Sequence, residues 1–456
     1  MQILTKDKGF YRSFFSLWRV LVLNHVIVLG VNLADNIMLG SYSEPALSGA
    51  TACNQVQFVF LQIIVGLGNA LVVMCSQYWG MRNTTPIKRL TVASLACGMT
   101  FAVILFTLAS VMPEKIVGIF TDSPEIISQG VEYLEYIKYT YPVFALTSIL
   151  LASMRSVESV KVGFVVSVIT LILNVSLNYV LIFGKLGFES MGAKGAAIAT
   201  LIARCAELIY VLIHVLFIEK NLPMKAKELV RTDSQLFKKY LKTCIPFVVT
   251  DGLFGVSTAL QTVILGNMDD AAMAANSVST TLYSVLKVAA IGSATAASVI
   301  IGKSIGEGKS KQQIKEYSKT LQFIFICIGV CTGILLFMIR TPVISLYGNI
   351  SDEAKILANG FLLVLCVTCV GTSYQMPVNT GIVRGGGDSK FVLVLDIISI
   401  WLIVLPLSFA AAFLWHWHPV AVIACLNADQ VFKCLPAAIK VNRYNWIKRI
   451  AEKQAS

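Results

Sequence analysis

Charged residues are scarce in this chain. Only 14% of its 456 residues are Asp, Glu, Lys or Arg, whereas 56% are hydrophobic. A soluble domain usually carries about 25% charged residues, so a soluble fold of this composition would lack material for a wetted surface. The apolar excess must therefore face lipid. At about 20 apolar residues per span, the chain has room for roughly a dozen transmembrane helices joined by short loops.

The motifs of several enzyme classes are also missing. The sequence has no GxxxxGK[ST] phosphate loop, no HExxH pair and only four histidines, so no nucleotide-hydrolysing or metallopeptidase-like site is indicated. Two of the histidines, His416 and His418, flank Trp417, a pattern that favours an interfacial aromatic belt over a metal site. The eleven cysteines lie mostly inside apolar runs and are interpreted as small apolar side chains. We predict a protein that is not an enzyme and has no metal or cofactor.

The net charge of +12 is spread over short loops between apolar runs. This placement is typical of membrane orientation, so no nucleic-acid partner is predicted. Of the 37 Lys and Arg residues, 28 fall on one side of the membrane, five on the other and four within spans. The positive-inside rule therefore predicts that both termini are cytoplasmic. The basic N-terminus has no small-residue cleavage site, and we expect the first helix to be retained.

Apolar runs bounded by Gly, Pro and charged residues predict the membrane spans. Backbone groups in the bilayer core must pair within their own segment, so these runs must be helices. The predicted fold class is an all-α membrane protein with twelve transmembrane helices. The spans are expected at residues 14–40, 52–79, 90–112, 130–154, 162–184, 194–218, 240–266, 277–302, 319–340, 356–383, 391–414 and 418–440.

The second half of the chain repeats the first at a shift of 226 residues, which becomes 229 further along. The matched pairs are Gly40 with Gly266, Gly66 with Gly292, Gly80 with Gly306, Arg155 with Arg384 and Lys161 with Lys390. Each half holds six spans, an even number. The two six-helix bundles should therefore share an orientation and be related by a pseudo-twofold axis along the membrane normal.

The repeat predicts three parts: an N-terminal six-helix lobe at 1–220, a basic cytoplasmic linker at 221–239, and a C-terminal six-helix lobe with a basic tail at 240–456. Two such bundles can rock about their interface and open a central cavity to each side in turn. This arrangement favours a transporter over a channel or a membrane enzyme.

Several motifs then point to one family. They are Asp35-Asn36-Ile37-Met38-Leu39-Gly40, Gln77-Tyr78-Trp79-Gly80, the run from Gly192 to Thr200, and the paired loops from Arg155 to Lys161 and from Arg384 to Lys390. Together they resemble the multidrug and toxic compound extrusion (MATE) family, over a stretch from about residue 15 to Trp446.

The resemblance implies a secondary active antiporter of the bacterial inner (cytoplasmic) membrane. Such a protein exports amphipathic or cationic organic compounds, as in multidrug efflux, in exchange for inward sodium ions or protons. We expect a monomer whose partners are a small organic substrate and the lipid bilayer.

Ionisable groups inside a membrane are costly, so each one is a functional candidate. Asp35 is the strongest, because Asn32, Asp35 and Asn36 share one face of the first span, with His25 on the same stripe. A carboxylate among amide oxygens can hold a dehydrated sodium ion, or take up a proton when burial disfavours its charge. The alternative is an aspartate near a helix end that bonds to a loop.

The resemblance adds Asn174, Asn178 and Thr200, whose matching positions surround the first-helix aspartate in related transporters. In some relatives the position of Asn178 is a carboxylate. The amide here removes a proton acceptor and leaves a neutral oxygen suited to sodium. The alternative is that the two asparagines only bridge helices by hydrogen bonds.

Asp251 follows Pro246 by five residues in the seventh span. Its position resembles an acidic site that many bacterial members of the family keep. We interpret it as a second ion site or a contact to a cationic substrate. A salt bridge or a packing hydrogen bond is the alternative.

Other charged residues within the spans are expected to pair with each other. Arg204 and Glu207 at i, i+3 and Asp429 and Lys433 at i, i+4 have the spacing of structural ion pairs. Lys287 and Asp396 are weaker functional candidates.

The substrate cavity has polar and aromatic candidates that could contact a flat organic cation. They are Gln62, Tyr141, Tyr283, Tyr374 and Met376. An alternative function is a flippase of lipid-linked oligosaccharide or peptidoglycan precursors. A pyrophosphate lipid would call for several inward cations, and the bundles offer only Arg204, Lys287 and Lys433, which disfavours that function.

Overall fold

The computed structural model of the chain describes residues 4–121, 123–225, 227–228, 233–266, 268, 270–346 and 351–451. The expected linker at 221–239 therefore lies partly outside the described residues. Within them, eleven helices are long and apolar enough to cross a membrane. A bent pair, α5 (Pro124–Ile137) and α6 (Thr140–Ser156), supplies a twelfth span with an angle of 51° between its halves. The prediction of an all-α membrane protein with twelve transmembrane helices is confirmed.

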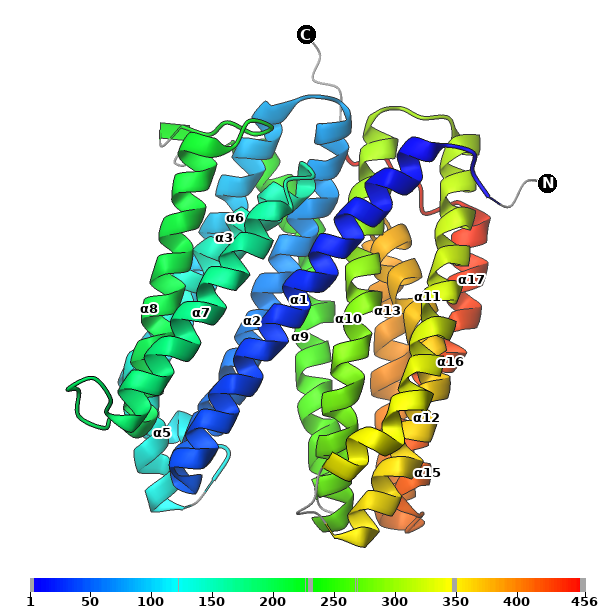
Figure 1. Cartoon of the computed structure of the whole chain (residues 1–456). Helices are drawn as coiled ribbons and strands as arrows, with labels where there is room; N and C mark the ends of the chain where they lie inside the picture. Colours follow the sequence, from blue (N-terminus) through cyan, green and yellow to red (C-terminus); the bar gives the residue numbers. More distant parts are fainter. Residues whose placement is uncertain are drawn as a thin grey trace. The chain divides into compact units, whose positions relative to one another are not determined.

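The first half of the chain contributes the helices drawn in blue to green in Figure 1. They are α1 (Lys8–Tyr42), α2 (Glu44–Gly80), α3 (Thr84–Val111), the short α4 (Pro113–Val117), α5, α6, α7 (Lys161–Phe183), and α8 (Gly192–Ile213), which continues into the π-helical turn η1 (His214–Ile218).

The second half contributes the rest. They are α9 (Ser234–Gly266), α10 (Asp270–Gly306), α11 (Lys311–Leu346), α12 (Asp352–Met376) with η3 (Pro377–Val383), then α13 (Ser389–Asp396), η4 (Ile397–Val404), α14 (Leu405–Phe409) and η5 (Ala410–Leu414) as one span, and α15 (Pro419–Leu426), α16 (Asp429–Phe432) and α17 (Cys434–Arg443) as the last.

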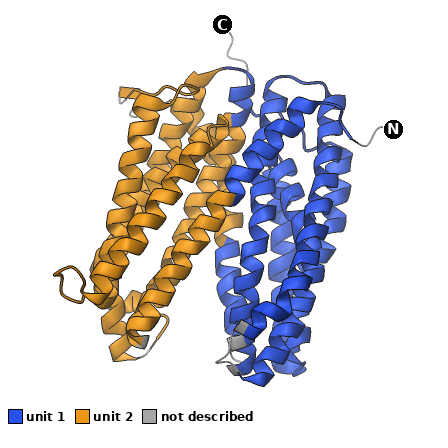
Figure 2. Cartoon of the chain, in the orientation of Figure 1, with its two compact units in different colours: residues 1–22, 76–82, 253–456 blue, residues 23–75, 83–252 orange. Residues whose placement is uncertain are grey.

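The chain divides into two compact units (Figure 2). Unit 1 comprises residues 1–22, 76–82 and 253–456, and unit 2 comprises residues 23–75 and 83–252. The chain therefore crosses between the units inside α1, inside α2, after Arg82 and inside α9. The expected lobes follow chain order, whereas these units exchange the ends of three helices.

Unit 2 is built around the pairs α7 with α8 and α3 with α6, which pack along their lengths. Gly184 ends α7 in the left-handed region, at φ +66°, which glycine adopts without a steric penalty. The turn that follows returns the chain as α8. There Gly195 packs against the end of α7, where a Cβ atom would lie 2.7 Å from the carbonyl oxygen of Leu181. This close approach brings the polar residues of α7 and α8 together.

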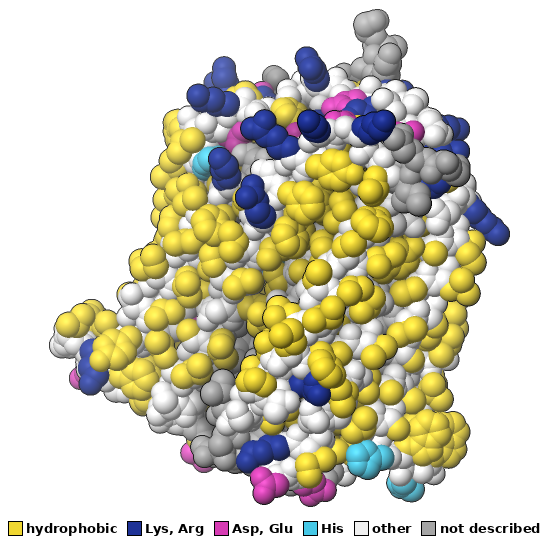
Figure 3. All heavy atoms as spheres, turned by 45° about the vertical axis from the view of Figure 1, so that its right-hand side comes forward, with side chains coloured by type: hydrophobic (Ala, Val, Ile, Leu, Met, Phe, Trp, Pro, Cys, Tyr) yellow, Lys and Arg dark blue, Asp and Glu magenta, His cyan; other side chains and the backbone are white. Residues whose placement is uncertain are grey.

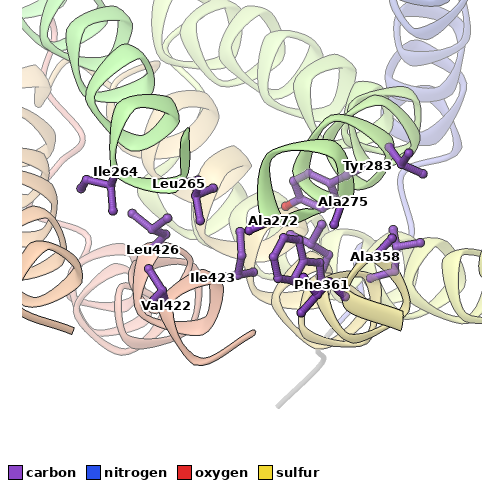
Figure 4. Packing of buried hydrophobic residues seen from close by; sticks show 14 of the residues in the cluster. Ile264, Leu265, Ala272, Ala275, Tyr283, Ala358, Phe361, Val422, Ile423 and Leu426 are labelled. Atoms are coloured by element: carbon purple, nitrogen blue, oxygen red, sulfur yellow. The ribbon is translucent and has the colours of Figure 1, made fainter. Parts of the chain in front are cut away.

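Unit 1 has an apolar core that gathers side chains from α9, α10, α12 and α15 (Figure 4). Phe361 is a member of this core with no exposed surface. The labelled members are Ile264, Leu265, Ala272, Ala275, Tyr283, Ala358, Phe361, Val422, Ile423 and Leu426. The cysteines of both units are free, including Cys366 and Cys369, which form a Cys-x-x-Cys spacing inside α12.

Large hydrophobic side chains remain exposed along the spans. Phe217, Met338 and Val367 are 82%, 68% and 68% exposed, which a water-facing surface rarely tolerates but a lipid-facing one requires. On the face shown in Figure 3, hydrophobic side chains cover the surface between the ends, and Lys and Arg side chains gather at one end. This distribution fits a membrane-embedded belt with a basic edge.

The last described residues form a tail that docks on unit 1. Trp446 is completely buried, and the backbone N–H of Lys448 donates to the carbonyl of Gly386 at 2.8 Å. Gln77, at the end of α2, binds the tail through both ends of its side-chain amide. Its nitrogen donates to the Lys448 carbonyl at 3.1 Å, and its oxygen accepts from Ile450 N at 2.7 Å and Ala451 N at 3.0 Å. The end of α2 is thereby fixed to unit 1.

Two lysines hold the loop beneath the tail. Lys440 and Lys448 lie 2.7 and 2.9 Å from the carboxylate oxygens of Asp388. Burial alone would raise the pKa of Asp388, but the hydrogen bonds from the two lysines outweigh it and lower that pKa below its ordinary value.

Candidate functional site

Asp35, Asn174, Asn178 and Thr200 form one hydrogen-bonded cluster inside unit 2. The amide nitrogen of Asn178 donates to Asp35 Oδ1 at 2.5 Å and to Asn174 Oδ1 at 3.1 Å. Asn174 in turn donates to Thr200 Oγ1 at 3.2 Å. Asn174 and Asn178 are 1% and 0% exposed, whereas Asp35 is half-buried. Asp35 of α1 is therefore bonded to Asn178 of α7 and is linked through Asn178 and Asn174 to Thr200 of α8.

The carbonyl of Asn178 is the unsatisfied atom of this cluster. Asn178 Oδ1 is buried and accepts no hydrogen bond from any residue that the structure describes. An ionised carboxylate can only accept hydrogen bonds, so Asp35 requires the N–H side of the amide and the carbonyl must lie on the other side. A buried carbonyl without a donor costs free energy, which a bound cation would recover. The cluster thus offers oxygens to a dehydrated sodium ion or a carboxylate to a proton.

Two of the expected ligands lie outside this cluster. Asn32 and Asn36 are exposed, and neither side chain makes a hydrogen bond to the described part of the chain. His25 lies further back on α1 and is half-buried, next to the charge of Arg155. The structure therefore joins Asp35 to residues of α7 and α8 and not to its neighbours on α1.

Asp251 lies elsewhere in unit 2, between α9 and α2. Its carboxylate accepts a hydrogen bond from Asn69 Nδ2 at 3.1 Å. The two helices approach closely one turn away, where a Cβ atom on Gly66 would sit 3.0 Å from the Cα atom of Val248. Tyr240 adds a second link, since its hydroxyl donates to the Leu67 carbonyl at 2.9 Å. Asp251 therefore lies among the contacts that pack the first part of α9 against α2 in unit 2.

The expected ion pairs are present at short distances. Arg204 lies 2.8 Å from Glu207, with its guanidinium 5.2 Å from the ring centre of Phe144. In unit 1, Lys433 Nζ lies 3.0 Å from Asp429 and 2.8 Å from Asp396. Lys433 and Asp429 are both 3% exposed. Lys433 therefore pairs with both the buried Asp429 and the half-buried Asp396, which makes a triad and not the simple couple that the helical spacing indicated.

A polar network that was not predicted from the sequence extends from this triad. Gln430 donates to both oxygens of Asp429 at 2.9 Å and accepts from Thr372 and Gln375, each at 2.9 Å. The repeat held a signal for it. At the shift of 229, Asp429 aligns with Thr200, Lys433 with Arg204 and Cys434 with Cys205. Thr200 of the Asp35 cluster and Asp429 of this network therefore occupy matching positions of the repeat.

The candidate cavity residues are divided between the units. Tyr141, in unit 2, is 1% exposed and packs on Phe60 with ring centres 5.4 Å apart. In unit 1 the hydroxyl of Tyr283 lies 2.7 Å from that of Thr372, and Tyr374 donates to Gln322 at 2.9 Å. Gln62 and Met376 are half-buried. The tyrosines are thus held in the interiors of their units, and their contact with a substrate stays a prediction.

A groove of about 360 Å³ lies between α3, α6 and α8 of unit 2. Its lining is apolar and includes none of the candidate cavity residues. The lining residues are Val92, Leu95, Ala96, Met99, Leu146, Leu150 and Leu212. An apolar lining of this kind is typical of a lipid-facing depression. The groove contains none of the residues of the polar clusters.

Comparison with known proteins gives consistent matches along the chain. A model of the MatE family matches residues 21–180 and 246–410. A probable multidrug resistance protein NorM of Thermotoga maritima is 24% identical, over 93% of this chain and 90% of that protein. A probable multidrug resistance protein NorM of Agrobacterium fabrum is 25% identical, over 84% of this chain and 83% of that protein.

Solved structures share the fold. The Vibrio cholerae MATE transporter VcmN has a TM-score of 0.86 at 16% identity, with 97% of this chain and 98% of that chain covered. A MOP superfamily transporter from Pyrococcus furiosus has a TM-score of 0.85 at 16% identity, with 98% and 99% covered. At these identities the likeness concerns the backbone arrangement alone.

Proposed function

Because the chain belongs to the MatE family of transporters, we propose that it is a secondary active antiporter that exports amphipathic or cationic organic compounds in exchange for inward sodium ions or protons. The relatives named as probable multidrug resistance proteins support this substrate class. The chain is a multi-pass membrane transporter and not an enzyme. We further propose that it is a monomer in the bacterial inner membrane with both termini in the cytoplasm.

The observation that carries the proposal is the cluster around Asp35. A carboxylate inside a membrane-spanning helix is costly, and here it faces a buried amide whose carbonyl has no donor within the described chain. Sodium requires oxygen ligands, and a proton requires a carboxylate. Asp35, Asn178 and Thr200 supply both within one packed unit.

The ion would act by changing the charge of this cluster. An ionised Asp35 disfavours close packing of α1 on α7 in a low-dielectric interior, and neutralisation by sodium or a proton removes that penalty. A ligand that binds one arrangement of the unit better than another shifts the population toward it. Coupling follows if the arrangement that holds the ion is also the one that releases the drug.

Ion pairing favours antiport of organic compounds over movement of pyrophosphate lipids. Of the three cations expected inside the bundles, Arg204 and Lys433 are each bound to carboxylates of their own unit. They are therefore not available to a pyrophosphate. Only Lys287 remains, whereas a doubly charged headgroup calls for several cations.

The test is uptake in proteoliposomes. A fluorescent organic cation is supplied while a sodium gradient or a proton gradient is imposed alone, and we expect one of the two gradients to drive transport. Asp35→Asn should abolish gradient-driven transport with normal yield and folding. Asp352→Asn, the same change at a side chain that is 94% exposed, is the matched control and should transport normally. Full coupled transport by Asp35→Asn would refute the assignment.

A further inference from the structure

The end of α2 belongs to a different unit from the rest of that helix. Residues 44–75 of α2 lie in unit 2, and residues 76–80 lie in unit 1. The helix is continuous across this boundary. The proposed antiport cycle requires the two units to move relative to each other, so α2 must then either bend near residue 75 or release its end from unit 1. The contacts that hold this end of α2 therefore bear on the cycle.

Within unit 1 the end of α2 meets the end of α10 backbone to backbone. A Cβ atom on Gly306 would lie 2.7 Å from the carbonyl carbon of Gln77, and a Cβ atom on Gly80 would lie 2.7 Å from the amide nitrogen of Glu307. Glycine allows this approach because it has no side chain. For the same reason the contact buries little apolar side-chain area at these positions. Hydrogen bonds therefore have more weight in holding the two ends together.

The tail, residues 446–451, supplies hydrogen bonds to this end of α2. Gln77 is completely buried, and its side-chain amide bonds to main-chain groups of three tail residues, Lys448, Ile450 and Ala451. If the tail left, this amide would remain buried without these partners, and a buried polar group without a partner is unfavourable. A docked tail therefore stabilises the position of α2 against α10.

The tail is anchored on unit 1 independently of Gln77. Trp446 is completely buried and rests on Gly386, where a Cβ atom would lie 2.6 Å from the Cζ3 atom of the indole. Lys448 bonds to the Gly386 carbonyl through its backbone N–H at 2.8 Å and pairs with Asp388 through its ammonium at 2.9 Å. The tail thus connects the loop after η3 to the end of α2.

The first half of the chain holds the matching loop in a similar way. At the shift of 229, Ser159 corresponds to Asp388. Glu219 corresponds to Lys448 at the same shift. The Ser159 hydroxyl donates to Glu219 at 2.5 Å, where the second half has an ion pair. Anchorage of this loop is therefore common to both halves. The bonds to Gln77 are additional, because they join the tail of the second half to a helix of the first.

We propose that the tail is a latch on the transport cycle, which holds the end of α2 on α10 when it is docked and lets this end leave unit 1 when it is released. The inference rests on the proposed antiport function and adds a control element to it. A segment that binds one arrangement of the protein shifts the population toward that arrangement. Because the tail is tethered to unit 1, it acts at a high effective concentration.

The experiment measures how often the end of α2 leaves α10. Ser76 is completely buried and faces α10, where a Cβ atom on Gly302 would lie 3.0 Å from the Ser76 Cβ atom. Ser76→Cys introduces a thiol at this contact, and Cys75→Ala removes the neighbouring one. A water-soluble maleimide labels the new thiol only when the contact opens. Mass spectrometry of the full chain in proteoliposomes gives the labelling rate.

Three variants are compared in this background. Gln77→Leu removes the hydrogen bonds to the tail but leaves the Trp446 anchor. A chain that ends at Tyr444 lacks the tail, and a chain that ends at Ala451 keeps every described contact of the tail and is the matched control. If the chain that ends at Tyr444 fails to fold, Gln77→Leu provides the test, because it keeps the anchored tail.

We expect Gln77→Leu and the chain that ends at Tyr444 each to label roughly 10- to 100-fold faster than the parent chain, the weight of two or three ordinary hydrogen bonds. The chain that ends at Ala451 should label at the parent rate. Gln77→Leu should add nothing in the shorter chain. An unchanged rate in Gln77→Leu would overturn the inference. An equal effect of Gln77→Leu with and without the tail would also overturn it, because it would show a role in helix packing alone.

Labelling during transport distinguishes a latch from a permanent anchor. In the parent chain the labelling rate should rise several-fold when a fluorescent organic cation and the driving gradient are supplied together. Transport without such a rise would overturn the latch, because the end of α2 would then stay docked through the cycle. Absence of transport would instead overturn the antiport proposal, and the labelling rates without a gradient would still show whether the tail holds α2.

Discussion

Replacing Asn178 by leucine should weaken sodium binding selectively. The change removes the N–H group that bonds to Asp35 at 2.5 Å and the buried carbonyl that has no donor in the described chain. An interaction with a charged partner is worth about 1.5–3 kcal/mol. The dissociation constant for sodium should therefore rise by roughly 10- to 100-fold.

Thermal stability in detergent measures this loss. A ligand at 100 times its dissociation constant stabilises the folded state by about 2.7 kcal/mol. A 10-fold weaker site at the same sodium concentration gives about 1.4 kcal/mol, and a 100-fold weaker site about 0.4 kcal/mol. The upward shift in Tm that sodium causes, relative to choline at equal ionic strength, should shrink in the same proportion.

Asn36→Leu is the control, because Asn36 is exposed and lies outside the cluster although it neighbours Asp35 in the sequence. It should keep the full sodium-dependent shift. A full shift in Asn178→Leu, or its loss in Asn36→Leu, would refute the assignment of ligands. If the parent chain shows no sodium-dependent shift, the coupling ion is the proton, and the sodium reasoning is wrong.

Three further predictions concern unit 1. Lys433→Met leaves the buried Asp429 and the half-buried Asp396 without their cation and should destabilise the protein by about 3–5 kcal/mol. Lys355→Met removes the partner of a carboxylate that is 94% exposed and should leave Tm nearly unchanged. Gln77→Leu removes three hydrogen bonds to the tail and should speed proteolytic removal of the C-terminus without loss of the core; an unchanged cleavage rate would show that Trp446 suffices. The lysine partners of Asp388 lower its pKa. Its contribution to the stability of the docked tail is therefore present at neutral pH and is lost as pH falls below about 3.8. When the pH is lowered from 5 to 3, the rate at which pepsin cuts the tail should increase more in the parent chain than in Asp388→Asn.

The number and type of the spans could be predicted from the sequence, because twenty apolar residues in a row leave no alternative to a helix. Their ends could not. The second span begins at Glu44 and the ninth at Lys311, eight residues before the expected starts at 52 and 319. Polar residues continue a helix beyond the bilayer, and an apolar run gives no sign of them.

The candidate site could be predicted only where the helix partners were known. Helical spacing placed Asn32 and Asn36 on the same face of α1 as Asp35. Only Asp35 on that face bonds to α7, whereas Asn32 and Asn36 are exposed. Asn178 came from the family resemblance and not from spacing. The unit 1 network was not predicted because Thr372, Gln375 and Gln430 are uncharged and far apart in the sequence, and only the packing of α12 against α16 brings them together.

The exchange of helix ends between the units has a consequence for dissecting the protein. A cut at the basic segment 221–239 would leave residues 1–22 and 76–82 of unit 1 on one fragment and the first part of α9 on the other. Neither fragment would carry a complete core, because each contains helix segments that belong to the unit of the other. The two halves should therefore fold when they are produced together and should not fold when either is produced alone.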